Sequence, residues 1–283
     1  MHAARRVTWR PSWAPVCVGA AILVVYWDVV TGLTRQWATD QDYSHAFLVP
    51  PLAAYFAYQR RARLQSAAVR PTAAGLLVVA AGLITFAAGV AAADLFLARV
   101  SLLPVIAGCV LFLFGFDHIR ILAFPLAFLL LMIPLPAIVF NDVTLPLQLL
   151  ASQAGELVLR AAGIPVLRDG NVLELVGLRL EVAEACSGIR SLLALITFAI
   201  TVGQFGSSST LRVCVLIIAT LPIAIATNAA RVAGTGLAAH VWGPVAAQGF
   251  LHTASGAIAF AGAVLTLVGF ERGTRRNVLR MAA

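Results

Sequence analysis

Long apolar runs separated by short polar segments recur along the chain. Most of these runs approach the 20 or so residues that a helix needs to cross a bilayer. The pattern predicts eight membrane-spanning helices, at residues 13–30, 45–58, 73–93, 100–116, 119–140, 186–205, 211–230 and 252–270. The predicted fold class is therefore an all-α polytopic membrane protein, with one integral membrane domain covering residues 1–283.

The longest segment outside these runs is an external insert at residues 141–185, between the fifth and sixth spans. Its first half, 143–163, has helical periodicity and predicts an amphipathic helix; whether it spans, lies on the membrane or re-enters it stays open. In its second half, apolar residues alternate with charges between Val172 and Val182, and Asp169-Gly170-Asn171 is a turn signal. We expect a small β-hairpin there.

Composition excludes a soluble domain, because 61% of the residues are hydrophobic and only 11% are charged. All 20 basic residues are arginines, and the formal net charge is +8. The arginines form short clusters between apolar runs, which is typical of cytoplasmic loops rather than of a nucleic-acid surface. Membrane lipid is thus an expected partner and nucleic acid is not.

The distribution of arginine predicts the orientation of the chain. Eight crossings place thirteen arginines on the side of both termini and seven on the other side. Because the arginine-rich side of a membrane protein faces the cytoplasm, both termini are expected there. We therefore expect a multi-pass protein of the inner membrane whose external loops face the periplasm.

Three chemically capable residues lie at the predicted external ends of three consecutive spans. Cys186 begins span six, Arg231 ends span seven and His252 begins span eight. A thiol, a cation and an imidazole are the components of a cysteine acyl-transfer site. Cys186 is the expected nucleophile, His252 the general acid and base, and Arg231 the stabiliser of the oxyanion.

Neighbouring residues could support or replace these three. Asn228 shares a helix face with Arg231, and Ser187 could cap the helix that follows Cys186. Arg190, one turn after Cys186, could supply the positive charge in place of Arg231. His240 could replace His252, and Glu184 and Glu181 could orient a base or bind substrate.

Each of these residues also has a structural interpretation. A lone cysteine is usually a packing residue, and an arginine at a span end commonly reaches towards headgroups. The polar stretch from Asp40 to His45 is interpreted as a capped helix start rather than a substrate contact. Metal-ligand spacing is missing around Cys186 and the histidines, so we expect no metal and no cofactor.

The motifs resemble those of the exosortase/archaeosortase family of membrane cysteine transpeptidases. The resemblance rests on EACSGIRSL around Cys186, NAARV ending at Val232, HTASG from His252, YSHAFLVPP at 43–51 and FPLAFLLLMIPLP at 124–136. It implies cleavage of C-terminal sorting signals through a thioester on Cys186, with Arg231 and His252 assisting. Such a signal comprises a short Pro-Glu-Pro-like motif, a transmembrane helix and an arginine-rich tail, on proteins linked to exopolysaccharide production.

Three other functions fit parts of the same pattern. An exopolysaccharide-related transporter would use the spans without needing Cys186. A protease that only hydrolyses would share the residues but form no amine-dependent product. A structural membrane scaffold would tolerate substitution at all three candidate positions.

Overall fold

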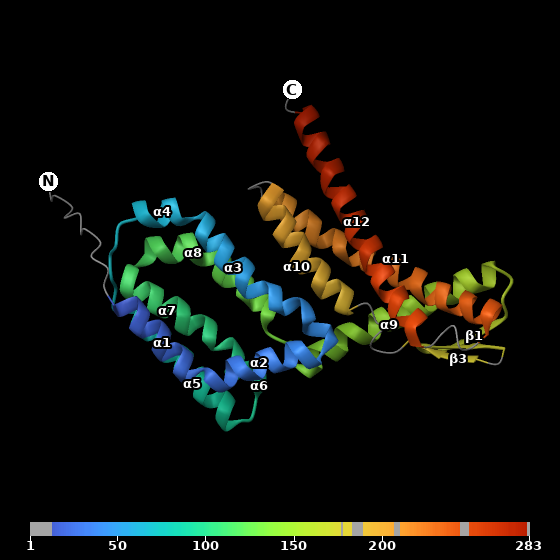
Figure 1. Ribbon diagram of the computed structural model, residues 1–283, viewed down its shortest axis with the longest axis horizontal. Coiled ribbons are helices and arrows are strands. Elements are labelled where there is room, and N and C mark those ends of the chain that lie inside the picture. Colours follow the sequence, from blue (N-terminus) through green and yellow to red (C-terminus); the bar gives the residue numbers. More distant parts are fainter. Residues whose placement is uncertain (1–12, 177, 183–188, 207–209, 244–248, 282–283) are drawn as a thin grey trace. The chain divides into compact units, whose positions relative to one another are not determined.

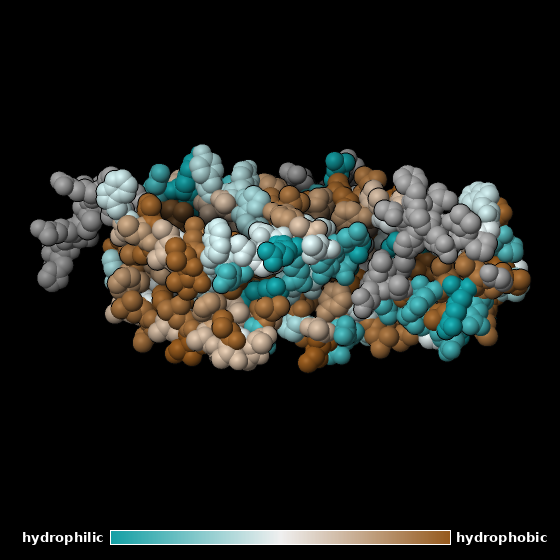
Figure 2. Space-filling model, turned by 60° about the horizontal axis from the view of Figure 1, so that its bottom comes forward, coloured by the Kyte–Doolittle hydropathy of each residue, from teal (hydrophilic) through white to brown (hydrophobic). Residues whose placement is uncertain are grey.

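The computed structural model describes residues 13–176, 178–182, 189–206, 210–243 and 249–281, with the backbone alone at 206, 249–253 and 274–281. Most of these residues are helical, and the chain divides into two units, Met1–Pro136 and Ala137–Ala283. Figure 1 shows the helices along the chain and the one small sheet. Apolar side chains cover much of the surface that Figure 2 presents, which fits an all-α polytopic membrane protein.

Among its described residues, from 13 onwards, the first unit contains helices and no strand. Its elements are α1 (Ala14–Val25), α2 (Trp27–Thr39), the 3-10 helix η1 (Gln41–Leu48), α3 (Val49–Gln59), α4 (Arg61–Ser66), α5 (Ala74–Ala91), α6 (Leu95–Val100), α7 (Leu102–Phe114), α8 (Phe116–Phe128) and the 3-10 helix η2 (Leu129–Met132).

Glycines set the closest helix contact of this unit, between α5 and the pair α6 and α7. Gly75, Gly82 and Gly89 recur every seven residues, so they form one stripe along α5. A Cβ atom at Gly82 would lie 2.7 Å from Val105 Cγ2, and one at Gly89 would lie 2.5 Å from the Ala98 nitrogen. Small residues thus let these helices approach at backbone distance, as they do in other membrane bundles.

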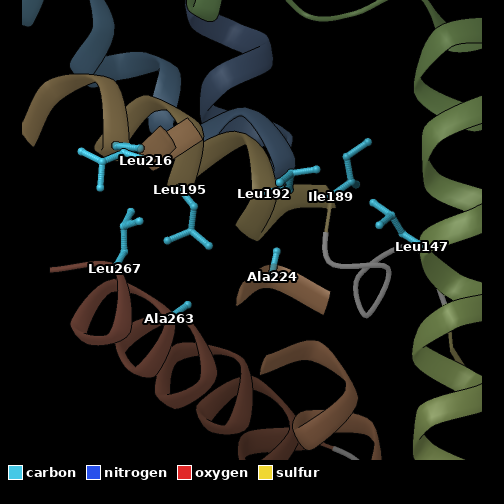
Figure 3. Close-up of a cluster of buried hydrophobic side chains, with 9 residues drawn as sticks. Leu147, Ile189, Leu192, Leu195, Leu216, Ala224, Ala263 and Leu267 are labelled. Carbon is cyan, nitrogen blue, oxygen red and sulfur yellow. The ribbon is translucent and has the colours of Figure 1, made fainter. Parts of the chain in front are cut away.

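The second unit packs three helices around α11. Its elements are α9 (Ala137–Ala161), β1 (Val166–Asp169), β2 (Val172–Leu175), β3 (Leu178–Glu181), α10 (Ile189–Gly206), α11 (Thr210–Trp242) and α12 (Gly249–Met281). Figure 3 shows one buried apolar cluster, to which α9, α10, α11 and α12 contribute. Its members are Leu147, Ile189, Leu192, Leu195, Ala199, Leu216, Ala224, Ala263 and Leu267.

A second apolar cluster joins the sheet to α9 and α11. It consists of Ala151, Leu159, Ile164, Val166, Leu173, Val182 and Val232. The sheet is antiparallel in the order β1-β2-β3, with Asp169 opposite Val172 and Leu175 opposite Leu178. Strands therefore form where the alternating segment predicted a two-stranded hairpin, but a third strand, β1, precedes them.

The number of spans predicted from hydropathy is not confirmed. Among the described residues, four helices are long and apolar enough to cross a membrane, or up to six if two helix pairs joined by short breaks each count as one span. Only ten residues of the predicted second span, 49–58, are α-helical, and they belong to α3 (Val49–Gln59), which follows η1. The predicted fifth span is interrupted after η2, where Pro134 and Pro136 cannot donate helical hydrogen bonds. Eight spans therefore stay a prediction.

The amphipathic segment predicted at 143–163 lies almost entirely within the single helix α9. The buried positions of α9 include Gln148, Ser152, Gly155 and Leu159, which recur every three or four residues and form one face. Whether α9 spans the membrane or lies on it stays open.

Candidate functional site

The hydropathy pattern predicted Arg231 at the end of span seven. In the structure Arg231 lies within helix α11, not at its end. Helix α11 continues to Trp242 and is followed by Gly243 with φ +86°, a conformation typical of helix ends. Thirty-three helical residues extend about 50 Å, more than the roughly 30 Å of a hydrocarbon core. Arg231, 21 residues after Thr210, lies about 32 Å along the helix. This distance is close to the thickness of the hydrocarbon core and is consistent with the predicted position of Arg231 near the membrane boundary.

The side chain of Arg231 reaches across to α12. Its Nε donates a hydrogen bond to Ser255 Oγ at 3.4 Å. Its guanidinium lies over Gly256, where an added Cβ would come within 3.2 Å of Nη2 and 3.3 Å of Cζ. Ser255 and Gly256 therefore form the surface of α12 on which the half-buried Arg231 side chain packs. The sequence motif HTASG contributes these two residues.

His252 lies in the first turn of α12, and the structure describes its backbone only. Positions 252 and 255 are three residues apart and thus lie on the same side of the helix. The hydrogen bond from Arg231 to Ser255 consequently brings Arg231 to within one helical turn of the backbone of His252.

The alternative histidine is poorly placed for the same partner. His240 is exposed and lies nine residues after Arg231 on α11. Nine residues correspond to two and a half turns, which puts the two residues on opposite sides of the helix and about 14 Å apart along it. Position 252 is therefore better suited than His240 to act with Arg231.

Asn228 lies one turn before Arg231 and is buried, with 7% of its surface exposed. Buried amides in proteins are nearly always hydrogen-bonded, so Asn228 is well suited to fix the helix face that carries Arg231. Arg190 lies in the first turn of α10 and is half-buried, directly after the fully buried Ile189. Its proposed role as an alternative cation stays a prediction.

Cys186, Ser187 and Glu184 lie outside the described residues. The chain is nevertheless held on both sides of them. Val182, 1% exposed, belongs to the same apolar cluster as Val232, the neighbour of Arg231. After the gap, Ile189 is also 1% exposed and packs in the cluster that contains Leu147 of α9.

Hydrogen bonds fix the first of these two anchors. The N–H of Val182 donates to the carbonyl of Asn171 at 2.9 Å, and the Asn171 side chain donates back to the Val182 carbonyl at 3.3 Å. These two bonds attach Val182 to the turn between β1 and β2.

An ion-pair network attaches the sheet to α9. Glu156 accepts a hydrogen bond from Arg168 of β1 at 2.9 Å and forms an ion pair with Arg160 at 2.7 Å. Ser152 of α9 donates to the carbonyl of Gly170 in the turn between β1 and β2, at 3.0 Å. The sheet is therefore attached to α9 by polar contacts as well as by the apolar cluster that contains Val232.

The two proline-containing motifs of the first unit pack against each other. Trp37 Nε1 donates to the Met132 carbonyl at 3.0 Å, and the Leu135 N–H donates to Tyr43 Oη at 3.2 Å. Burial raises the pKa of Tyr43, and the hydrogen bond from Leu135 acts in the opposite direction. These bonds satisfy backbone groups where prolines interrupt the helix, a structural role that the spacing of the motifs did not reveal.

Asp40 caps the start of η1, as the sequence had indicated. Its carboxylate accepts a hydrogen bond from the Asp42 N–H at 2.9 Å. Within the parts of the chain that the structure describes, no three His, Cys, Asp or Glu side chains gather as a metal site would require. The arrangement around Arg231 can instead stabilise a developing negative charge, because its cation is held in a fixed position.

Comparison with known proteins identifies the family of this chain. The family model described as transmembrane exosortase matches residues 37–269, a range that contains all three candidate residues and both proline-containing motifs. No curated protein and no solved structure matches the chain. Because the family match covers most of its length, the protein belongs to the transmembrane exosortases, a family of membrane cysteine transpeptidases.

Proposed function

We propose that this protein cleaves C-terminal sorting signals at the outer face of the inner membrane through a thioester on Cys186. The expected substrate carries a short Pro-Glu-Pro-like motif, a transmembrane helix and an arginine-rich tail, and is linked to exopolysaccharide production. The observation that carries the proposal is the contact of Arg231 with Ser255 and Gly256, three and four residues after His252. It joins the two helices that supply the proposed cation and base.

The reaction follows the usual course of cysteine acyl transfer. His252 takes the proton of the Cys186 thiol, and the thiolate attacks the carbonyl carbon of the scissile peptide bond. Arg231 stabilises the negative charge that forms on the carbonyl oxygen. The carbon–nitrogen bond then breaks, and His252 returns the proton to the leaving amine. A recipient amine or water attacks the resulting thioester and releases Cys186.

The distribution of arginine supports the proposed side of the membrane. The thirteen arginines assigned to the cytoplasm include clusters at both termini and in the segment from Arg60 to Arg70. On this assignment the candidate residues face the periplasm, where exported substrates arrive. A reporter fused after residue 281 should be active only in its cytoplasmic form.

The decisive experiment is co-expression with a tagged three-part substrate, comparing the wild type with Cys186→Ala. We expect a product without its C-terminal tail only with the wild type, detected by gel shift and mass spectrometry. The mass of the new terminus separates transfer to an amine from hydrolysis. Equal processing by both proteins would exclude Cys186 as the nucleophile and favour a transporter or scaffold.

A further inference from the structure

Strand β3 forms one edge of the small sheet. The strand order is β1-β2-β3, and among the described residues no strand pairs with the outer side of β3. β3 also leads towards the candidate nucleophile, since Cys186 follows its last residue, Glu181, by five positions. Figure 1 shows the small sheet, with β1 and β3 labelled. An unpaired strand edge is a row of hydrogen-bonding groups that an extended peptide can occupy.

The hydrogen-bond register shows which groups of β3 are available. In an antiparallel pair, successive residues direct their N–H and C=O groups alternately towards and away from the partner strand. The N–H of Val182 donates to Asn171, so the backbone of Leu180 also faces β2. The backbone N–H and C=O groups of Arg179 and Glu181 consequently point to the outer edge.

The side chains of β3 suit a bound strand. Leu178 and Leu180 are half-buried, and Leu180 packs on the apolar cluster that contains Val232. Arg179 and Glu181 are exposed and lie on the opposite face of the sheet. Exposed charges on an edge strand discourage indiscriminate pairing. A peptide chosen by charge can still pair, because Arg179 offers a cation, 4.0 Å from Glu174.

We propose that the outer edge of β3 binds the extended segment of the substrate beside the scissile bond, as a fourth antiparallel strand. This inference rests on the proposed function and specifies how that function recognises its substrate. A transmembrane helix hides its peptide groups in its own hydrogen bonds, so the segment to be cut must be extended before a thiolate can attack it. Pairing with β3 stabilises that extended form next to the cluster that holds Val232.

The proposed sorting motif fits the available groups. Proline lacks an N–H and is tolerated in an edge strand only where it faces away from the partner. In Pro-Glu-Pro the prolines are two residues apart, so both face away when the glutamate backbone faces β3. Opposite Arg179, the glutamate side chain gains a cross-strand ion pair, whereas opposite Glu181 it meets a like charge. The favoured register therefore pairs the substrate glutamate with Arg179.

The first test compares two substitutions at one position of the full-length protein. Glu181→Pro removes an outward N–H but no hydrogen bond to β2, whereas Glu181→Ala keeps that N–H and measures the side-chain contribution. We expect Glu181→Pro to process the tagged substrate about tenfold more slowly than Glu181→Ala. Leu180→Pro, which removes an inward N–H, should lower the thermal midpoint, and Glu181→Pro should not. Equal rates for the two Glu181 variants would overturn the proposal.

The second test does not depend on turnover. In the Cys186→Ala protein, a photo-crosslinking residue replaces Glu181 on the outer edge of β3 or Leu167 of β1, so that Arg179 stays in place, and the tagged substrate is co-expressed. We expect crosslinks to the substrate from position 181 and at least about fivefold fewer from position 167. Crosslinks from position 181 to a second copy of the chain, or none to the substrate, would overturn the proposal.

The two tests also separate this inference from the proposed function. Processing by the wild type without a substrate crosslink at position 181 would refute only the pairing with β3. A crosslink at position 181 without any processing by the wild type would support the pairing and refute the proposed cleavage.

Discussion

Gly256 offers a substitution that should lower activity without lowering stability. An alanine Cβ at this position would lie 3.2 Å from Nη2 and 3.3 Å from Cζ of Arg231, whereas non-bonded atoms prefer about 3.5–4.0 Å. The guanidinium must therefore move by a few tenths of an ångström. The hydrogen bond from its Nε to Ser255, already 3.4 Å long, should then be lost.

The opposite effect on stability follows from the helix itself. Replacing glycine by alanine within a helix stabilises it by about 0.5–1 kcal/mol. Since a misplacement of about 1 Å in a catalytic group can cost about 100-fold in rate, a few tenths of an ångström should cost about three- to tenfold. We expect Gly256→Ala to process the tagged substrate more slowly by that factor, with an unchanged or higher thermal midpoint in detergent.

A matched control lies in the same helix. Gly262 is six residues further along α12, and a Cβ there would have no neighbour within 4 Å. Gly262→Ala should show the same gain in stability without the loss of processing. The reasoning would be refuted if Gly256→Ala, properly folded, processed the substrate at the wild-type rate, or if both variants lost activity equally.

Three further predictions test the surroundings of the site and the packing of the first unit. Ser255→Ala removes the acceptor for Arg231 and should slow processing about fivefold, whereas Ser255→Thr, which keeps a hydroxyl, should recover part of the rate in the same assay. His252→Ala should lower processing at least about 100-fold, and His240→Ala should leave it within a factor of about two; the reverse order would exchange their roles. Gly82→Val should destabilise the protein by about 1–3 kcal/mol by overpacking against α7, measured by thermal unfolding in detergent, while Gly19→Val, with no neighbour within 4 Å, should not; equal midpoints would contradict the close helix contact.

Hydropathy predicted well those helices that depend on apolar length alone. The run expected at 73–93 forms α5, Ala74–Ala91, and the run expected at 100–116 contains α7, Leu102–Phe114. Hydropathy did not predict where α11 ends, because the charged residue Arg231 was taken as the end of its span. Arg231 is followed by eleven further residues of α11, up to Trp242, because a single charged side chain lowers the hydropathy without interrupting the backbone hydrogen bonds of the helix.

The contacts between helices could not be predicted from the sequence, because the hydropathy of one apolar run does not show which other run it packs against. The motif HTASG gave no partner for Ser255 and Gly256, and the fold shows that both lie against the guanidinium of Arg231. Strand β1 was also missed, because Val166 and Leu167 are adjacent apolar residues and do not alternate with the charges that follow. Its place depends on the ion pair of Arg168 with Glu156, which joins residues twelve positions apart.

The roles of Cys186, Ser187 and Glu184 remain predictions from the sequence. The structure limits only the ends of the segment that carries them, at Val182 and Ile189. Val182 and Ile189 are buried in two separate apolar clusters. Sequence periodicity predicts that such residues are buried, but it does not predict which residues they contact.

The length of α11 has a consequence for the choice of substrate. From Thr210 to Arg231 the helix measures about 32 Å, close to the thickness of the hydrocarbon core. Under the proposed function, the substrate helix lies in the same bilayer, and its hydrophobic length must match this length for the cleavable bond to lie at the depth of Arg231. A substrate segment several residues shorter or longer presents its cleavable bond at the wrong depth, so hydrophobic thickness itself becomes a criterion of selection.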